Sequence, residues 1–505
     1  MSTTGSHAQS ARALVLPLAL AQFIASYAGT NMNVAITTIA NDLGCSVSGI
    51  QTTITLFTLT MASLMIPGSK LSDIWGRKTC FIWGLIIYGT GALLASLAQG
   101  LPLLMVSYSL LEGVGSALMI PPIYILITVS FDRVETRAKY FGVVGGAAGL
   151  GAAAGPLIGG LVTSGISWRA SFILQFLVVA AIVLLARSIV DPPRTGKAPR
   201  FDLGGAVLSA AGLFFIVYGV LQSATFGWGK AREDLTIGGK VVLSKGSISP
   251  VWIFLALGLL ILAWCAWHLH RVERAGGTPL VALRLFRNRV SNLGLLTQNV
   301  QWLVLQGSFF VLSVFLQEVR HLNAIETGLT LTPATVGILV ASAFAERMAR
   351  RRAQAMLVRG GFVLTLLGMA LLLMLVRKDT GFLAAMPGLL FMGLGVGVML
   401  TASVNVVQSS FPASDQGDIS GVSRSVSNLG SSLGVALAGS VLVSAAAPGN
   451  EQYLVAMLIL AVITLIGLVA AFLIPAVRPG AGRASTVGPP PVSSPVDEAA
   501  RAHRS

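Results

Sequence analysis

Apolar stretches long enough to cross a lipid bilayer repeat fourteen times along this chain of 505 residues. A membrane-spanning helix needs about 20 mostly apolar residues, because each residue advances the helix by only about 1.5 Å. Charged residues make up 10% of the chain, against about 25% in soluble domains. We therefore expect an all-α polytopic membrane protein. The expected spans are 13–36, 50–68, 79–98, 102–130, 139–164, 169–190, 203–223, 251–269, 290–317, 327–346, 355–376, 381–408, 420–446 and 452–475.

The basic residues follow the loops between these stretches rather than one patch. The formal net charge is +15, and if both termini are cytoplasmic, most of the 34 Lys and Arg lie in cytoplasmic loops. This positive-inside pattern orients a membrane protein with its basic loops in the cytoplasm. We therefore predict cytoplasmic N and C termini, a location in the plasma or inner membrane, and no nucleic-acid partner.

The spans group as six, two and six, because polar segments separate them after the sixth and the eighth. The outer loop of the middle pair has strand-forming residues on both sides of Gly238-Gly239, which predicts a short hairpin. The predicted units are a cytoplasmic N-terminal tail (1–12), a six-helix bundle (13–190), a linker (191–202), two inserted spans (203–270, with the outer loop at 224–250), a second linker (271–289), a second six-helix bundle (290–476) and a disordered cytoplasmic tail (477–505).

Two corresponding loops carry a carboxylate shortly before basic residues. The loop after the second span reads Ser69-Lys-Leu-Ser-Asp-Ile-Trp-Gly-Arg-Lys78, and the loop after the tenth reads Ser342-Ala-Phe-Ala-Glu-Arg-Met-Ala-Arg-Arg351. Such charges can hold one bundle against the other until they are released, although a basic loop can also serve only to orient the chain. We predict a gating role for Asp73, Gly76, Arg77, Lys78, Glu346 and Arg347.

A glycine-rich string in the fifth span predicts a close contact between helices. Gly151, Gly155 and Gly159 recur every four residues, so they line one helical face and let a neighbouring backbone approach. Pro156 removes one intrahelical hydrogen bond and bends the helix beside that face. We therefore expect an interface between the two bundles at Gly151, Gly155, Pro156, Gly159 and Gly160.

These motifs resemble those of the fourteen-span drug:proton antiporter branch of the major facilitator superfamily. Further matching strings are Ser167-Trp-Arg169, Phe201-Asp-Leu-Gly-Gly205, Pro279-Leu-Val-Ala-Leu-Arg-Leu-Phe-Arg-Asn288 and Gly328-Leu-Thr-Leu-Thr-Pro333. The resemblance implies two parallel six-helix bundles that give alternating access to a central cavity. It also implies export of amphipathic or lipophilic small molecules such as drugs.

Glu112 is the only clear carboxylate in the middle of a predicted span. An ionised carboxylate is costly there, so we expect it to be neutral, paired or facing a wet cavity. We predict that Glu112 exchanges protons, although a permanently protonated side chain bonded to a neighbouring helix fits the sequence as well. The resemblance implies an acidic residue at the position of Ala28 and an Arg at that of Ser109. Because both are replaced, the sequence leaves proton coupling open.

Polar residues at helical spacing follow one face of the first, ninth and thirteenth spans. Such stripes line a polar cavity or form hydrogen bonds between helices. Because the stripes come from both bundles, we predict a central, mostly neutral cavity for a lipophilic cation paired with Glu112 or for a neutral compound. The candidate residues are Gln22, Ser26, Tyr27, Thr30, Asn31, Asn33, Gln298, Trp302, Gln306, Arg424 and Asn428.

Other classes of function lack support in the sequence. It contains no ATP-binding loop, metal-ligand cluster or disulfide framework, so we expect no enzyme, no catalytic residue, no cofactor and no metal site. We predict a secondary transporter for amphipathic or lipophilic small molecules, run by proton exchange if Glu112 titrates. The alternatives are a transporter of lipids or natural products with weak or no proton coupling, and a membrane sensor that lost transport. Expected partners are a small-molecule substrate, protons and membrane lipids, and the expected functional unit is a monomer.

Overall fold

The computed structural model describes residues 3–131, 134–189, 201–237, 240–351, 353–377, 382–411, 415–443 and 450–475. Within these ranges, 14 helical segments are long and apolar enough to cross a membrane. They match the predicted spans one for one, which confirms the fourteen-span helical fold. The segments are Ala11–Val34, Val47–Trp75, Arg77–Ser96, Leu101–Ile127, Gly142–Gly165, Trp168–Ala186, Leu203–Phe226, Pro250–Arg274, Arg289–Val319, Ala324–Ala341, Gln354–Leu375, Leu383–Gln408, Asp418–Leu442 and Asn450–Leu473.

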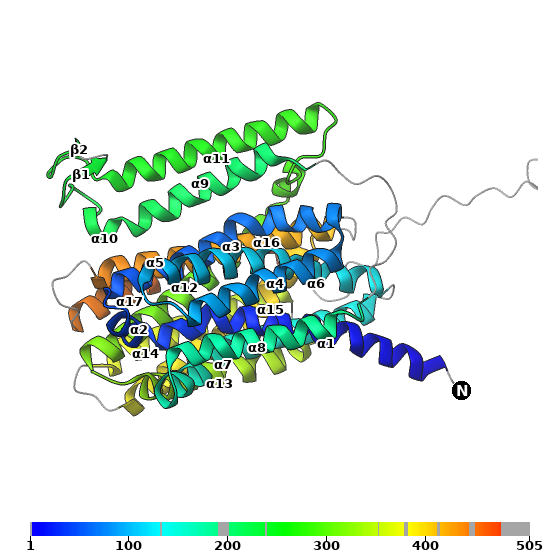
Figure 1. Cartoon of the computed structure of the whole chain (residues 1–505), viewed down its shortest axis with the longest axis horizontal. Helices are drawn as coiled ribbons and strands as arrows, with labels where there is room; N and C mark the ends of the chain where they lie inside the picture. Colours follow the sequence, from blue (N-terminus) through cyan, green and yellow to red (C-terminus); the bar gives the residue numbers. More distant parts are fainter. Residues whose placement is uncertain are drawn as a thin grey trace, which may run out of the picture.

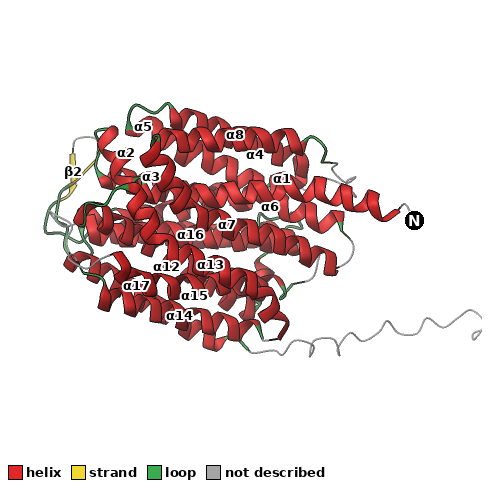
Figure 2. Ribbon diagram, turned by 90° about the horizontal axis from the view of Figure 1, so that it is seen from below, coloured by secondary structure: helices red, strands yellow, loops and turns green. Residues whose placement is uncertain are grey.

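The first six and the last six spans form two groups of helices that lie side by side (Figure 2). The first half consists of α1 (Thr3–Asn31), η1 (Met32–Val34), α2 (Ile36–Asp42), α3 (Val47–Trp75), α4 (Arg77–Ser96), α5 (Leu101–Leu104), the π-helical η2 (Met105–Glu112), α6 (Gly113–Ser130), α7 (Val134–Gly165) and α8 (Trp168–Ala186). The second half consists of η3 (Leu283–Arg287), α12 (Arg289–Val314), the π-helical η4 (Phe315–Val319), α13 (Ala324–Arg351), α14 (Gln354–Leu375), η5 (Phe382–Ala385), α15 (Met386–Gln408), α16 (Gln416–Val443) and α17 (Asn450–Leu473).

Two seams join the halves. At one seam α7 packs against α13, and at the other α3 packs against α16. Polar side chains are buried along these helices, whereas the outward faces of the spans carry exposed Leu, Ile, Val and Trp side chains. The polar interior therefore lies between the halves, where a path for a solute would be expected.

The inserted pair lies against the outside of the bundle (Figure 1). It consists of α9 (Leu203–Leu221), α10 (Ser223–Phe226) and α11 (Pro250–Arg274), and α9 packs against both α3 and α16. The pair therefore lies between the two halves in the sequence. In space the halves contact each other directly, and the pair packs on their outer surface. Its outer loop forms an antiparallel hairpin of β1 (Leu235–Ile237) and β2 (Lys240–Leu243), which confirms the predicted hairpin.

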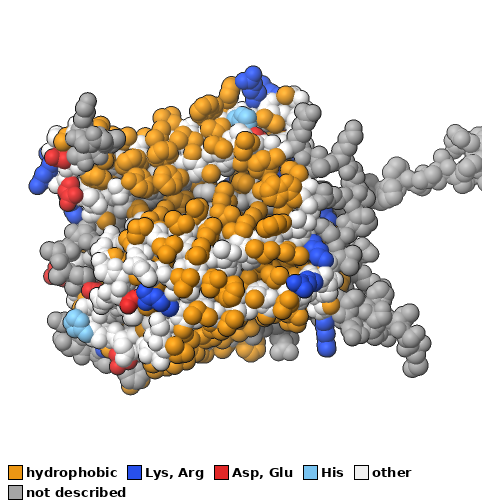
Figure 3. Space-filling model, viewed as in Figure 1, with side chains coloured by type: hydrophobic (Ala, Val, Ile, Leu, Met, Phe, Trp, Pro, Cys, Tyr) orange, Lys and Arg blue, Asp and Glu red, His pale blue; other side chains and the backbone are white. Residues whose placement is uncertain are grey.

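Hydrophobic side chains cover the middle of the face shown in Figure 3, and charged side chains gather at its two ends. One end contains the N-terminus and is called the terminal end, and the other contains β1 and β2 and is called the hairpin end (Figure 1). An apolar belt between two charged rims is the surface that a bilayer requires. Which end faces the cytoplasm stays a prediction.

Candidate transport site

A hollow lies between the halves. Its wall comes from α1, α3 and α6 of the first half and from α12 and α16 of the second. One part of the wall is apolar, with Phe57, Met61, Met65 and Ile120. The rest is mostly polar. It includes seven of the predicted cavity residues, which are Gln22, Ser26, Thr30, Trp302, Gln306, Arg424 and Asn428.

The other four candidates lie outside the wall. Tyr27 and Asn31 turn to α8, where the Tyr27 hydroxyl and the Asn31 amide each lie 2.8 Å from Ser171 Oγ. Gln298 donates to Ser427 Oγ at 2.7 Å and accepts from Ser423 Oγ at 2.9 Å, which holds α12 to α16. Asn33 is buried in η1. Polarity at helical spacing marked contacts between helices for Tyr27, Asn31 and Gln298. The Asn33 side chain has no hydrogen-bond partner among the described residues. None of the four lines the hollow in this conformation.

A contact between the halves forms the floor of the hollow toward the terminal end. The Arg424 guanidinium lies 4.8 Å from the centre of the Tyr124 ring and donates to the Tyr124 hydroxyl. That hydroxyl in turn donates to Gln22 Oε1 at 3.3 Å. Sequence reasoning missed Tyr124, because Arg424 and Tyr124 are 300 positions apart and no local pattern pairs them.

An ion pair crosses the α3–α16 seam at the terminal end. Lys70 Nζ lies 2.7 Å from Asp418 Oδ1, and both side chains are about a quarter exposed. Asp73 interacts electrostatically with Lys70, with Arg77 and with Asp418, so part of the predicted gating loop surrounds this pair. The sequence pointed to Asp73 and not to Lys70 as the residue at this contact.

The other predicted gating residues do not reach this ion pair in the described part of the chain. Lys78 donates to the carbonyl of Arg187 at 2.8 Å and therefore ties α4 to the end of α8 within the first half. Gly76 links α3 to α4 with a φ of 107°, a conformation that favours glycine. Glu346 and Arg347 belong to α13, but their side chains lie outside the described residues.

Neutral hydrogen bonds close the hairpin end between the halves. Gln317 of η4 accepts from Thr37 Oγ1 at 2.8 Å and donates to the carbonyl of Asn33 at 3.2 Å. At the α7–α13 seam, the Ile325 amide donates to Ser164 Oγ at 3.0 Å. Contacts between the halves therefore lie on both sides of the hollow.

The glycine string of α7 lies against two helices at once. A Cβ atom at Gly151, Gly155 or Gly159 would collide with Phe23, Thr30 or Asn31 of α1. A Cβ atom at Gly160 would lie 2.5 Å from the carbonyl oxygen of Ala324 in α13, and one at Gly328 would lie 2.5 Å from that of Pro156. The string thus packs α7 within its own half and, through Pro156 and Gly160, against the other half.

Glu112 lies in the interior of the first half and not in the wall of the hollow. It ends the π-helical segment η2 and is fully buried, with its Cγ packed toward Gly91 of α4. Tyr88 lies beside it and donates to Gln175 Oε1 at 2.6 Å. Neither Glu112 oxygen has a well-aligned hydrogen-bond partner among the described residues. Glu112 does not line the hollow in this conformation, and its pairing with a bound cation stays a prediction.

Neutral contacts occupy the two positions where the family resemblance implied charges. The carbonyl of Ala28 accepts from the Tyr108 hydroxyl at 3.0 Å. Ser109 Oγ donates to the carbonyl of Thr53 at 2.7 Å. Both sites are buried, and they hold α1, η2 and α3 together without a carboxylate or a guanidinium. Elsewhere in the described residues, no cluster of three His, Cys, Asp or Glu side chains could bind a metal ion.

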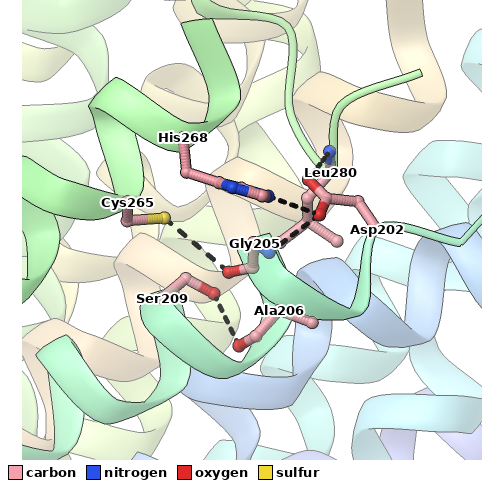
Figure 4. Close-up of polar contacts among 7 residues, drawn as sticks. All are labelled: Asp202, Gly205, Ala206, Ser209, Cys265, His268 and Leu280. Carbon is pink, nitrogen blue, oxygen red and sulfur yellow. Dashed lines mark hydrogen bonds and ion pairs between the residues drawn. The ribbon is translucent and has the colours of Figure 1, made fainter. Parts of the chain in front are cut away.

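Asp202 anchors the inserted pair at the terminal end (Figure 4). It caps α9 by accepting from the Gly205 amide at 2.8 Å, lies 2.9 Å from His268 Nε2 of α11, and accepts from the Leu280 amide at 3.1 Å. Burial raises the pKa of the Asp202 carboxyl, but these three contacts outweigh burial and leave the pKa below its usual value. One carboxylate therefore fastens both inserted helices to the linker before α12.

Replacing Asp202 by Asn is expected to lower the melting temperature by a few degrees at neutral pH. The lowered pKa means that the folded state prefers the carboxylate, so its stabilisation is present above the usual carboxyl pKa and is lost as the pH falls through the lowered value. The difference between wild type and Asp202→Asn should therefore shrink below about pH 4. Thermal unfolding across pH tests this, with Glu233→Gln in the exposed outer loop as the control. An equal loss in both variants would contradict the anchor.

Comparison with known proteins identifies the family of this chain. The Major Facilitator Superfamily matches residues 18–435. The chain is 30% identical over 422 residues to the "Probable actinorhodin transporter" of Streptomyces coelicolor, a match that covers 82% of this chain and 69% of that protein. It is 31% identical over 438 residues to "Puromycin resistance protein pur8" of Streptomyces alboniger, a match that covers 86% of this chain and 82% of that protein.

The crystal structure of an auto-inhibited POT family peptide transporter has the same fold, with a TM-score of 0.61 and 15% identity. The match covers 91% of this chain and 95% of that chain. The chain is thus a multi-pass membrane protein that belongs to the Major Facilitator Superfamily, a family of transporters and not of enzymes.

Proposed function

We propose that this protein exports amphipathic small molecules, among them antibiotics, by alternating access between its two halves. The observation that carries the proposal is the hollow at the centre of the seam, to which both halves contribute. Rocking of one half against the other would open such a hollow to one side of the membrane at a time. The two relatives described above, one named for actinorhodin transport and the other for puromycin resistance, support antibiotics as the substrate class.

The composition of the wall supports an amphipathic substrate. Phe57, Met61 and Met65 form an apolar surface, and methionine side chains adapt to differently shaped ligands. Gln306 and Asn428 provide amide groups on the opposite half. A site with a large apolar part and a few polar groups binds compounds that have both characters.

Proton exchange through Glu112 is the proposed energy source. Its support is geometric, because Glu112 is a fully buried acid at the end of a π-helical segment, and such segments are frequent at functional sites. The neutral contacts at Ala28 and Ser109 favour a second candidate, a natural-product or lipid transporter with weak or no proton coupling. One chain contains both halves and the whole hollow, so a monomer in the membrane lipid is the proposed functional unit.

Efflux assays test the proposed function. Bacteria that lack their own pumps would express the protein and be challenged with puromycin, with the cationic dye ethidium and with the anionic dye carboxyfluorescein. We expect resistance or dye efflux to rise over the empty vector for at least one of these compounds. If proton exchange drives export, a protonophore should abolish efflux. If the protein is instead a transporter with weak or no proton coupling, efflux should continue when the protonophore is present. Transport by purified protein in liposomes would exclude a sensor that lost transport. No export of any compound, with the protein present in the membrane, would refute the proposal.

A further inference from the structure

The wall of the hollow carries one kind of charge, and it is positive. Among the described residues that line the hollow, Arg424 alone has a formal charge, and the others are amides, hydroxyls or apolar groups. Glu112 could have balanced Arg424, but it lies inside the first half, next to Gly91 and Tyr88. The hollow is therefore electropositive rather than neutral or acidic.

The partners of Arg424 are neutral. Its guanidinium donates to the Tyr124 hydroxyl and lies 4.8 Å from the centre of the Tyr124 ring. The ion pairs among the described residues all involve other side chains. Removing a cation from water without a counter-ion costs free energy. An unpaired cation therefore binds an anionic group more strongly than a cation that already has an ionic partner.

We propose that the hollow selects compounds that carry an acidic group, such as a carboxylate or a phenolate, and that Arg424 binds this group. The inference rests on the proposed export function and replaces the lipophilic cation expected from the sequence. A guanidinium presents its N–H donors in a planar fork that matches a carboxylate with two parallel hydrogen bonds. The apolar part of such a compound would lie against Phe57, Met61 and Ile120.

Tyr124 acts as a positioning residue in this arrangement. Its ring supports the guanidinium at the floor of the hollow, and its hydroxyl also donates to Gln22. Because Tyr124 belongs to α6 and Arg424 to α16, the same contact joins the two halves. An anion that takes the guanidinium away from the Tyr124 hydroxyl therefore weakens a contact across the floor.

Two xanthene dyes test the proposal, because they share a ring system and differ in charge. Binding of fluorescein, an anion, and of rhodamine 6G, a cation, would be measured by fluorescence anisotropy on the purified full-length protein at neutral pH. We expect fluorescein to bind at least about tenfold more tightly than rhodamine 6G. Arg424→Gln should weaken fluorescein binding about tenfold and leave rhodamine 6G almost unchanged, and Arg424→Lys should restore part of the loss.

Two further variants separate the role of Arg424 from a general change of charge or fold. Arg287→Gln removes an exposed arginine at the terminal end, outside the hollow, and should change neither dye. Tyr124→Phe keeps the ring and removes the hydroxyl, so it should weaken fluorescein binding less than Arg424→Gln does. Thermal melting would verify that each variant is folded.

Three results would overturn the proposal. The first is that wild type binds rhodamine 6G more tightly than fluorescein, or does not bind fluorescein at all. The second is that folded Arg424→Gln keeps the dye preference of wild type. The third is that Arg287→Gln loses as much fluorescein binding as Arg424→Gln does. Failure of the proposed export function looks different, because cells would then export no compound at all. If only the anion assignment is wrong, cells still export, and Arg424→Gln does not change which compounds leave.

Discussion

Replacing Gly160 by Leu should abolish transport, whereas Gly146→Leu on the same helix should leave it almost unchanged. Even the first carbon of a side chain at Gly160 would lie 2.5 Å from the carbonyl oxygen of Ala324, so α7 and α13 would have to separate. Overpacking of this kind costs about 1–3 kcal/mol and sometimes more. No atom lies within 4 Å of a Cβ built at Gly146, and leucine favours a helix over glycine, so the control should be stable.

The measurement is uptake by protein in liposomes, together with thermal melting of each variant. We expect Gly160→Leu to lose transport while it remains folded, because the collision lies between the halves and not inside either one. Gly328→Leu changes the same seam from the side of α13, because a Cβ atom at Gly328 would lie 2.5 Å from the carbonyl oxygen of Pro156. It should therefore also lose transport. Normal transport by Gly160→Leu would show that this seam does not have to close.

Glu112→Gln is expected to abolish uphill transport while leaving exchange of substrate across the membrane intact. Glutamine preserves the volume beside Gly91 but cannot gain or lose a proton. Because Glu112 lies outside the wall of the hollow, its loss should not prevent substrate binding. Accumulation driven by a pH gradient and counterflow without a gradient, both in liposomes, separate the two activities.

Glu451→Gln is the matched control for Glu112→Gln, because it removes an exposed carboxylate at the start of α17. It should accumulate substrate as wild type does. Gradient-driven accumulation that survives in Glu112→Gln would exclude Glu112 as the coupling group and favour the second candidate, a transporter with weak or no coupling. Loss of counterflow as well would indicate that Glu112 supports the structure of the first half.

The spans and the glycine string could be predicted from the sequence because their causes are local. A run of apolar residues determines a span by itself, and the spacing of Gly151, Gly155 and Gly159 places them on one helical face whatever packs there. The identity of the neighbour is not local. The structure shows that the face meets α1, and that Gly160, one residue farther along, meets α13 in the other half.

The orientation of Glu112 could not be predicted, because the sequence does not mark the π-helical segment that Glu112 ends. A π-helix has more residues per turn than an α-helix, so it rotates the residues that follow relative to an ideal α-helix. The ion pair between Lys70 and Asp418 was missed for a different reason, since its partners lie in different halves and meet only when the seam is closed. The polar stripes likewise predicted which helical faces are buried. They did not predict whether the side chains of Tyr27 and Gln298 contact a neighbouring helix or line the hollow.

The inserted pair makes the two seams unequal toward the surrounding lipid. Helix α9 covers the α3–α16 seam, and in the described part of the chain no inserted helix packs comparably on α7 or α13. Next to the uncovered seam, an apolar depression lies between α13 and α15, lined by Leu329, Pro333, Val336 and Leu390 among others. On the α3–α16 side, a compound dissolved in the bilayer would therefore contact α9 before it reached the seam. On the α7–α13 side, no inserted helix among the described residues lies between the lipid and the seam. Of the two seams, the α3–α16 seam is thus the one that an inserted helix shields from the lipid.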